Sequence, residues 1–125
     1  MKAHRFPAAP ALLAALACLL LAGCGDERPP GVNAGDPARG KVALSQYGCR
    51  ACHMIPGVTG SEVYVGRPLE HMMRRRVIAG KLPNDQPNLV RWIRDPQAID
   101  PGTAMPNLGV SERDAIDMSA YLLGH

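Results

Sequence analysis

Five consecutive residues constrain this chain more than any other feature: Cys49-Arg50-Ala51-Cys52-His53 puts two thiols and an imidazole into one short segment. The chain has 125 residues but only one Trp, three Tyr and one Phe. The Phe is Phe6, close to the start, so few large flat side chains are left to fill the centre of a small domain. We therefore expect something other than side chains to supply part of the core.

The spacing of the two thiols suits one particular cofactor. Two cysteines three residues apart can form thioether bonds to the two vinyl groups of a single haem, and a histidine directly after the second cysteine is placed under the iron. This pentapeptide is the attachment pattern of haem c. We expect Cys49 and Cys52 to hold one covalent haem c, with His53 as the proximal iron ligand.

Three other chemistries use the same residues. A structural zinc site needs four ligands, and the later histidines, His71 and His125, are not paired at finger spacing. A thioredoxin-like redox pair belongs in a βαβ context, whereas strand-like alternation is nearly absent here. A plain disulfide suits an exported protein, but it explains neither His53 nor the scarcity of aromatic residues. Haem attachment is the interpretation that accounts for all of these features.

Helix signals flank the motif. Asp36 is a predicted N-cap and Pro37 a first helical residue, in a helix expected to run to Tyr47. A middle helix is expected over residues 69–79. The last helix is expected to start after Ser111, with Asp114 in the position of the usual Glu of a capping box. It then repeats small and apolar residues at helical spacing, namely Ala115, Ile116, Ser119, Ala120 and Leu123. With Gly40 and Leu44 on one face of the first helix, the two helices are expected to cross closely.

The second axial ligand is expected to be a methionine, because a thioether raises the potential of a haem iron. Met54 adjoins the motif on the proximal side and cannot reach round the ring. Met105 lies in residues 100–107, where two prolines and a glycine exclude regular structure. A stiff extended loop of this kind can press one side chain against a flat ring, so we predict Met105 as the distal ligand. The other candidates lie in predicted helices and are interpreted as core residues: Met72, Met73 and Met118.

The N-terminal residues resemble an export signal. Lys2 and Arg5 precede an apolar run over residues 11–22, which is too short to span a bilayer. The run ends in Leu21-Ala22-Gly23-Cys24, which resembles the lipobox of bacterial lipoproteins. We expect residues 1–23 to be a lipoprotein signal peptide and Cys24 to be lipidated, with an ordinary signal peptide as the alternative.

The expected domain organisation follows. Residues 24–35 are polar and rich in Gly and Pro, which predicts a flexible tether. Residues 36–125 then form the folded domain, expected at the cell envelope, anchored to a membrane and facing the periplasm. Without Lys2 and Arg5, the 14 Lys and Arg fall to 12 against 11 Asp and Glu. Nucleic-acid binding therefore has no support from charge.

The order of these features resembles the monohaem class I cytochrome c family, and the resemblance runs from about Asp36 to Leu123. It is closest to the cytochrome c domains associated with bacterial haem-copper oxidases, through the segments Ile-Ala-Gly-Lys-Leu-Pro-Asn at 78–84 and Asn-Leu-Val-Arg-Trp-Ile at 88–93. The resemblance implies an all-α fold, with three to five helices around one haem and little or no sheet.

The resemblance also implies roles for residues outside the motif. Gly66-Arg67-Pro68-Leu69 is similar to the family's Gly-Pro-x-Leu element, whose proline carbonyl accepts the proximal histidine's other ring proton. Arg67 stands where that proline is expected, which leaves open which carbonyl serves His53. Trp92 is positioned like the tryptophan that donates to a haem propionate, or else it fills the core. In the run Arg74-Arg75-Arg76, Arg76 is the candidate to pair with a propionate, and a solvated face is the alternative.

The implied function is electron transfer without catalytic residues. An iron with two protein ligands has no vacant site for substrate, so outer-sphere transfer of one electron is expected. The expected partners are redox proteins, such as a membrane oxidase or reductase. Two alternatives stay open: an electron-entry subunit of a larger respiratory oxidoreductase, and a sensor or peroxidase-like protein in which Met105 dissociates.

Overall fold

The computed structural model describes residues 31–61 and 65–125. The signal peptide and the lipidated Cys24 predicted above lie outside these residues. The described elements, in chain order, are helix α2 (Pro37–Gln46), the 3₁₀ turns η1 (Cys49–Ala51) and η2 (Met72–Arg74), strands β1 (Val77–Ile78) and β2 (Leu82–Pro83), and helices α3 (Gln86–Arg94), α4 (Pro96–Ile99) and α5 (Glu112–Leu123). Among the described residues, no helix has the length and apolar character needed to cross a membrane.

Helix α2 begins and ends as the sequence predicts. The Asp36 side chain accepts hydrogen bonds from the backbone N–H groups of Ala38 and Arg39, and a proline occupies the first turn. The helix ends at Gln46, with Tyr47 as its C-cap. Gly48 follows in the left-handed conformation, with φ 72°. This glycine turns the chain directly from α2 into η1, which carries the first cysteine of the motif.

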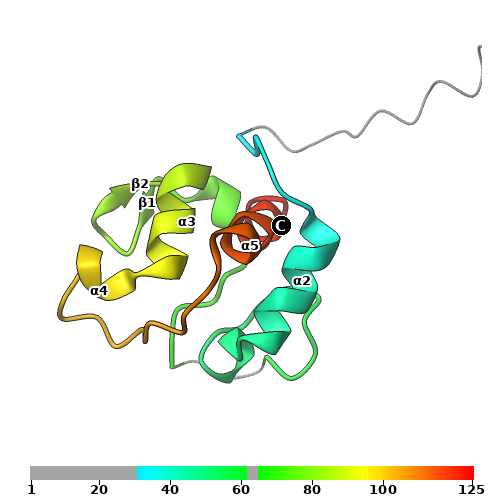
Figure 1. The fold of residues 1–125 in the computed structure, drawn as a ribbon, viewed down its shortest axis with the longest axis horizontal. Coiled ribbons are helices and arrows are strands. Elements are labelled where there is room, and N and C mark those ends of the chain that lie inside the picture. Colours follow the sequence, from blue (N-terminus) through cyan, green and yellow to red (C-terminus); the bar gives the residue numbers. More distant parts are fainter. Residues whose placement is uncertain (1–30, 62–64) are drawn as a thin grey trace, which may run out of the picture.

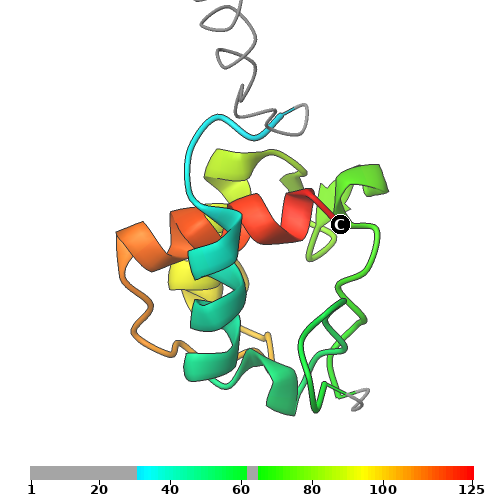
Figure 2. The same ribbon diagram turned by 90° about the vertical axis from the view of Figure 1, so that its right-hand side faces the viewer.

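Helices α2 and α5 cross in direct contact, as Figures 1 and 2 both show. A Cβ atom added at Gly40 would lie 2.0 Å from the backbone oxygen of Asp117. The close crossing predicted from the small residues is therefore confirmed. Helix α5 begins where the capping box predicts, since Ser111 Oγ accepts from the Asp114 N–H at 3.1 Å. Met118 on α5 is fully buried, as its interpretation as a core residue requires.

We predict that Gly40→Ala destabilises the folded protein by about 2–3 kcal/mol, because the added methyl group meets backbone rather than a movable side chain. Urea unfolding followed by circular dichroism measures the change. Val42→Ala on the same helix is the control, because Val42 is 54% exposed and its truncation leaves the crossing intact. Equal stability of Gly40→Ala and wild type would contradict the close approach.

The predicted helix over residues 69–79 is wrong. The structure has only the 3₁₀ turn η2 there, flanked by His71 at φ 56° and an extended Arg75, and it then enters β1. The segment is held in this form by a contact from outside it: Asn84 Nδ2 donates to the carbonyls of Met72 at 2.6 Å and Arg75 at 2.9 Å, where the 3₁₀ turn ends. Strands β1 and β2 pair antiparallel around a turn in which Ala79 and Gly80 have positive φ. Met72 is nevertheless buried, as expected of a core residue.

Residues 31–35, the described part of the predicted tether, contact the folded domain. Val32 is buried, and Gln86 Oε1 accepts from the N–H groups of Asn33 at 2.8 Å and Ala34 at 3.1 Å. Gln86 Nε2 in turn donates to the Ala34 carbonyl at 2.7 Å. The side chain of one buried glutamine thus satisfies three backbone groups of this segment. The packed part of the chain therefore begins before Asp36.

Candidate functional site

The attachment motif forms a tight turn after α2. The N–H groups of Cys52 and His53 both donate to the Cys49 carbonyl, at 3.2 and 3.0 Å. Cys49 and Cys52 are half-buried, and their sulfurs are not joined in a disulfide. Burial raises the pKa of the Cys49 thiol, and the neighbouring Cys52 adds to this effect. The raised pKa of Cys49 is opposite in direction to the lowered pKa of a reactive redox cysteine.

The His53 ring is fixed by backbone on two sides. Its Nδ1 donates to the Arg67 carbonyl at 2.7 Å, so the residue in the family's proline position does supply the acceptor. A Cβ atom at Gly66 would lie 2.3 Å from His53 Cε1, and therefore only glycine lets the chain approach the ring this closely. With Nδ1 occupied, Nε2 is the ring nitrogen left to bind a metal.

The segment that carries the Arg67 carbonyl is joined to the motif along its length. The Gly66 N–H donates to the Cys52 carbonyl at 2.7 Å, and the Leu69 N–H donates to the Met54 carbonyl at 2.8 Å. The guanidinium of Arg75 donates to the carbonyls of Pro68 and Glu70. Burial lowers the Arg75 pKa, and the nearby positive charge of Arg67 lowers it further. Within the described residues, Arg75 and not Arg76 is thus the arginine of the 74–76 run whose side chain hydrogen-bonds to the fold.

Met105 lies in the non-helical segment between α4 and α5, as predicted, and is half-buried. Its backbone is held by two side chains: Gln97 Nε2 donates to the Met105 carbonyl at 2.7 Å, and the Met105 N–H donates to Thr103 Oγ1 at 3.2 Å. Sequence reasoning missed both contacts, because neither a glutamine on a short helix nor a threonine in a loop carries a local signal. Asp95-Pro96, at the start of α4, is the only helix-start signal in the sequence close to these two contacts.

Trp92 and Arg76 are the two residues predicted to pair with haem propionates. Trp92 on α3 is half-buried against the hydrophobic core. Arg76 is exposed, and its backbone carbonyl accepts from the Asn84 N–H at 3.1 Å. Within residues 31–61 and 65–125, neither the Trp92 indole nor the Arg76 guanidinium forms a hydrogen bond. Their pairing with haem propionates stays a prediction.

Helix α5 forms hydrogen bonds to the segments before and after the attachment motif. Tyr121 Oη donates to the Pro56 carbonyl at 2.6 Å, which ties the residues after His53 to this helix. The buried Asp117 accepts from the Asp36 N–H at 2.7 Å and from Arg39 Nε at 2.8 Å, which joins α5 to the start of α2. These hydrogen bonds fix both ends of the segment that contains the cysteines.

The Asp117 carboxylate gives the domain an acid-sensitive contact. The hydrogen bond from Arg39 lowers the Asp117 pKa, although burial opposes the shift. The contribution to stability is therefore complete above the unfolded pKa of about 3.9 and is lost as the pH falls through the folded value. We predict that Asp117→Asn lowers the unfolding free energy by about 1.5–3 kcal/mol at pH 7 and by less below pH 4.

Urea unfolding of the haem-loaded protein at pH 7 and at a pH below 4 checks this prediction. Glu70→Gln is the control, because the Glu70 side chain is exposed and forms no ion pair within the described residues. A loss in Asp117→Asn that is the same at both pH values would mean that the carboxylate's charge has no part in it.

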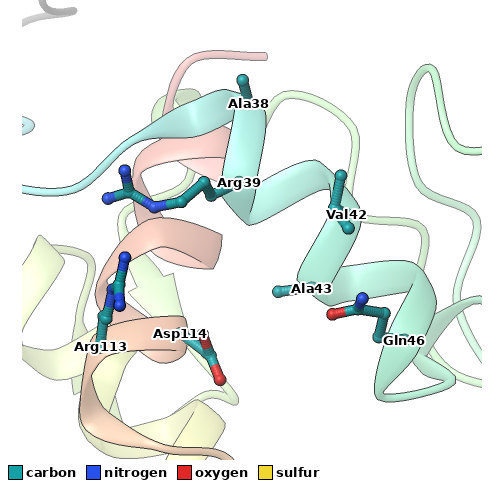
Figure 3. A pocket seen from close by; sticks show the side chains of 7 residues that line it. All are labelled: Ala38, Arg39, Val42, Ala43, Gln46, Arg113 and Asp114. Atoms are coloured by element: carbon teal, nitrogen blue, oxygen red, sulfur yellow. The ribbon is translucent and has the colours of Figure 1, made fainter.

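Figure 3 shows a shallow groove between α2 and the first turn of α5. It is lined by Ala38, Arg39, Val42, Ala43, Gln46, Arg113 and Asp114. No residue of the attachment motif and no methionine contributes to it, so the groove is separate from the candidate site. Across the described residues, no three His, Cys, Asp or Glu side chains come together in a cluster able to hold a metal ion.

Comparison with known proteins finds similarity to part of an oxidase subunit. The relative is cytochrome c oxidase subunit 2 of Alkalihalophilus pseudofirmus, which is 38% identical over 85 residues. The match covers 67% of this chain and 24% of that protein, so the chain spans about a quarter of the length of its curated relative. No family model matches the chain. No solved structure matches it either.

Proposed function

We propose that this chain is a c-type cytochrome, an electron carrier with one covalent haem c in a mainly helical domain. One observation carries the proposal: His53 lies beside two unpaired thiols in attachment spacing, with Nδ1 bonded to the Arg67 carbonyl at 2.7 Å. A carbonyl can only accept, so Nδ1 carries the proton and the lone pair is at Nε2. The imidazole is thereby oriented for one strong axial bond before any ligand binds.

The residues present fit the group. Cys49 and Cys52 would hold it covalently, and His53 Nε2 and the Met105 sulfur would bind its iron. The iron of a bound haem takes up and releases one electron between its ferrous and ferric states. The chain's own contribution would be to supply both protein ligands of the iron, which would leave no coordination position for a substrate. Among the described aromatic residues only Tyr121 is buried, so the described core contains few large flat side chains, as expected of a domain that holds a cofactor.

The similarity to a cytochrome c oxidase subunit supports the partner class. We propose that the chain passes electrons to a membrane oxidase, either as a separate carrier or as the electron-entry part of the complex. The predicted lipid anchor at Cys24 would keep the domain at the membrane surface where such a partner is found. In this arrangement the oxidase, and not this chain, carries out the reaction.

The test is a set of measurements on the purified protein. Its mass is expected to equal that of the mature chain plus one haem, and its ferrous spectrum to be that of a six-coordinate low-spin iron. Carbon monoxide at neutral pH is expected to bind poorly to wild type, because Met105 occupies the position it needs. Ready uptake of carbon monoxide would replace the carrier assignment by the sensor or peroxidase-like alternative.

A further inference from the structure

Both polar backbone groups of Met105 are bonded to side chains. Gln97 Nε2 reaches the carbonyl at 2.7 Å, and Thr103 Oγ1 accepts from the N–H at 3.2 Å. All three residues are half-buried. Pro106 follows directly and has no N–H of its own. In the described part of the chain, these two side chains are therefore the only groups that hydrogen-bond to the Met105 backbone.

Gln97 is presented by a short but fixed turn. The Asp95 side chain accepts from the Ala98 N–H at 3.2 Å, and the Asp100 N–H donates to the Pro96 carbonyl at 2.8 Å. Pro96 itself is among the most deeply buried residues. A glutamine on this turn has little freedom to move away from Met105, and its bond restrains the loop.

Thr103 is held in a similar way. Its N–H donates to the Asp100 carbonyl at 3.0 Å, and the Asp100 carboxylate lies 3.3 Å from Lys81 Nζ. Lys81 belongs to the turn between β1 and β2, so the start of the Met105 loop is joined to a distant part of the fold. The two side chains that hold Met105 thus act from two consecutive turns, which share Asp100 as an anchor.

The hydrogen bonds to the Met105 backbone matter because the side chain itself does little to fix the position of its sulfur. A methionine side chain is unbranched and has three rotatable bonds, so it restrains its own sulfur only weakly, and a fixed backbone reduces the number of positions that the sulfur can reach. If the Met105 backbone moves, its sulfur is less often in the position from which it would bind the haem iron. An external ligand that competes with the sulfur then binds more tightly, by the factor by which the open fraction rises.

We propose that Gln97 and Thr103 are positioning residues that hold Met105 as an axial ligand and set how readily another molecule displaces it. This inference rests on the proposed function. It assigns the control of iron accessibility to two side chains that are not themselves proposed iron ligands. Neither residue is part of the attachment motif.

The experiment compares full-length holoprotein variants in the ferrous state. Gln97→Leu keeps the side chain's bulk without the donor, and Thr103→Val keeps the shape without the hydroxyl. Each is expected to bind carbon monoxide about three- to tenfold more tightly than wild type, the factor set by one lost hydrogen bond. Each is also expected to have a lower midpoint potential, because the sulfur that favours ferrous iron is bound for less of the time.

Two further variants separate positioning from general damage. Thr103→Ser keeps the hydroxyl and is expected to keep the wild-type carbon monoxide affinity and potential. Gln46→Leu removes an exposed glutamine from α2 and is expected to change neither. Wild-type values in both Gln97→Leu and Thr103→Val, or a change in Thr103→Ser as large as in Thr103→Val, would overturn the inference.

Failure of the proposed function gives a different pattern. If Met105→Ala has the wild-type spectrum, Met105 is not the ligand, and the positioning inference falls with it. If Met105→Ala opens the iron while Gln97→Leu and Thr103→Val leave it closed, the carrier assignment stands and the positioning inference alone is wrong.

Discussion

Replacing Cys49 and Cys52 together with alanine is expected to abolish covalent haem attachment and to leave a poorly folded chain. The described core is built mainly from aliphatic side chains, and Tyr121 is its only buried aromatic residue. Domains of this size bury too little surface to be stable by a wide margin. Loss of a cofactor that fills the centre therefore removes a large part of the stabilising contacts.

The expected signature of the double cysteine variant is a mass lacking the haem, together with loss of a cooperative thermal transition in circular dichroism. Ala51→Ser, an exposed change between the two cysteines, is the control and is expected to keep both the haem and the transition. A compact haem-free variant that melts cooperatively would show that the side chains suffice for the core.

Changing Met105 is expected to have the largest effect on redox behaviour. Met105→His supplies a harder ligand that keeps the iron six-coordinate, so the midpoint potential is expected to fall by on the order of 0.1–0.3 V, within the roughly 0.8 V range set by axial ligation. Met105→Ala removes the ligand and is expected to bind carbon monoxide and to gain peroxidase activity. Redox titration and ferrous spectra measure both effects.

Met73→Ala is the matched control, because Met73 is 42% exposed and is expected to affect neither the potential nor the spectrum. Wild-type protein with a five-coordinate iron would contradict the carrier assignment itself. An unchanged spectrum in Met105→Ala would contradict only the choice of ligand, and Met72, Met73 and His71 would become the residues to test.

The sequence predicts those elements that depend on local chemistry. Asp36, Pro37 and Ser111 act within one helical turn of their own positions, and α2 and α5 begin where these residues indicate. The interrupted backbone around Met105 is equally local, since prolines and a glycine exclude a helix whatever the rest of the fold does. The close α2–α5 crossing was also predictable, because a small residue at position 40 is useful only at such a contact.

Non-local contacts account for what the sequence did not predict. Residues 69–79 are held in a non-helical form by Asn84, which lies beyond the segment and donates to carbonyls where the 3₁₀ turn ends. The hold of Gln97 on Met105 spans eight residues and depends on how α4 is anchored. The acceptor for His53 was left open, because a backbone carbonyl looks the same at every position of a sequence.

The hydrogen bond from His53 to the Arg67 carbonyl gives the main chain and the side chain of residue 67 independent roles. The main chain of residue 67 orients the imidazole, whereas its side chain is exposed at the surface. Substitutions there can alter surface charge while the same carbonyl still orients His53. Position 67 can therefore differ in charge between relatives without any change in how the His53 ring is oriented.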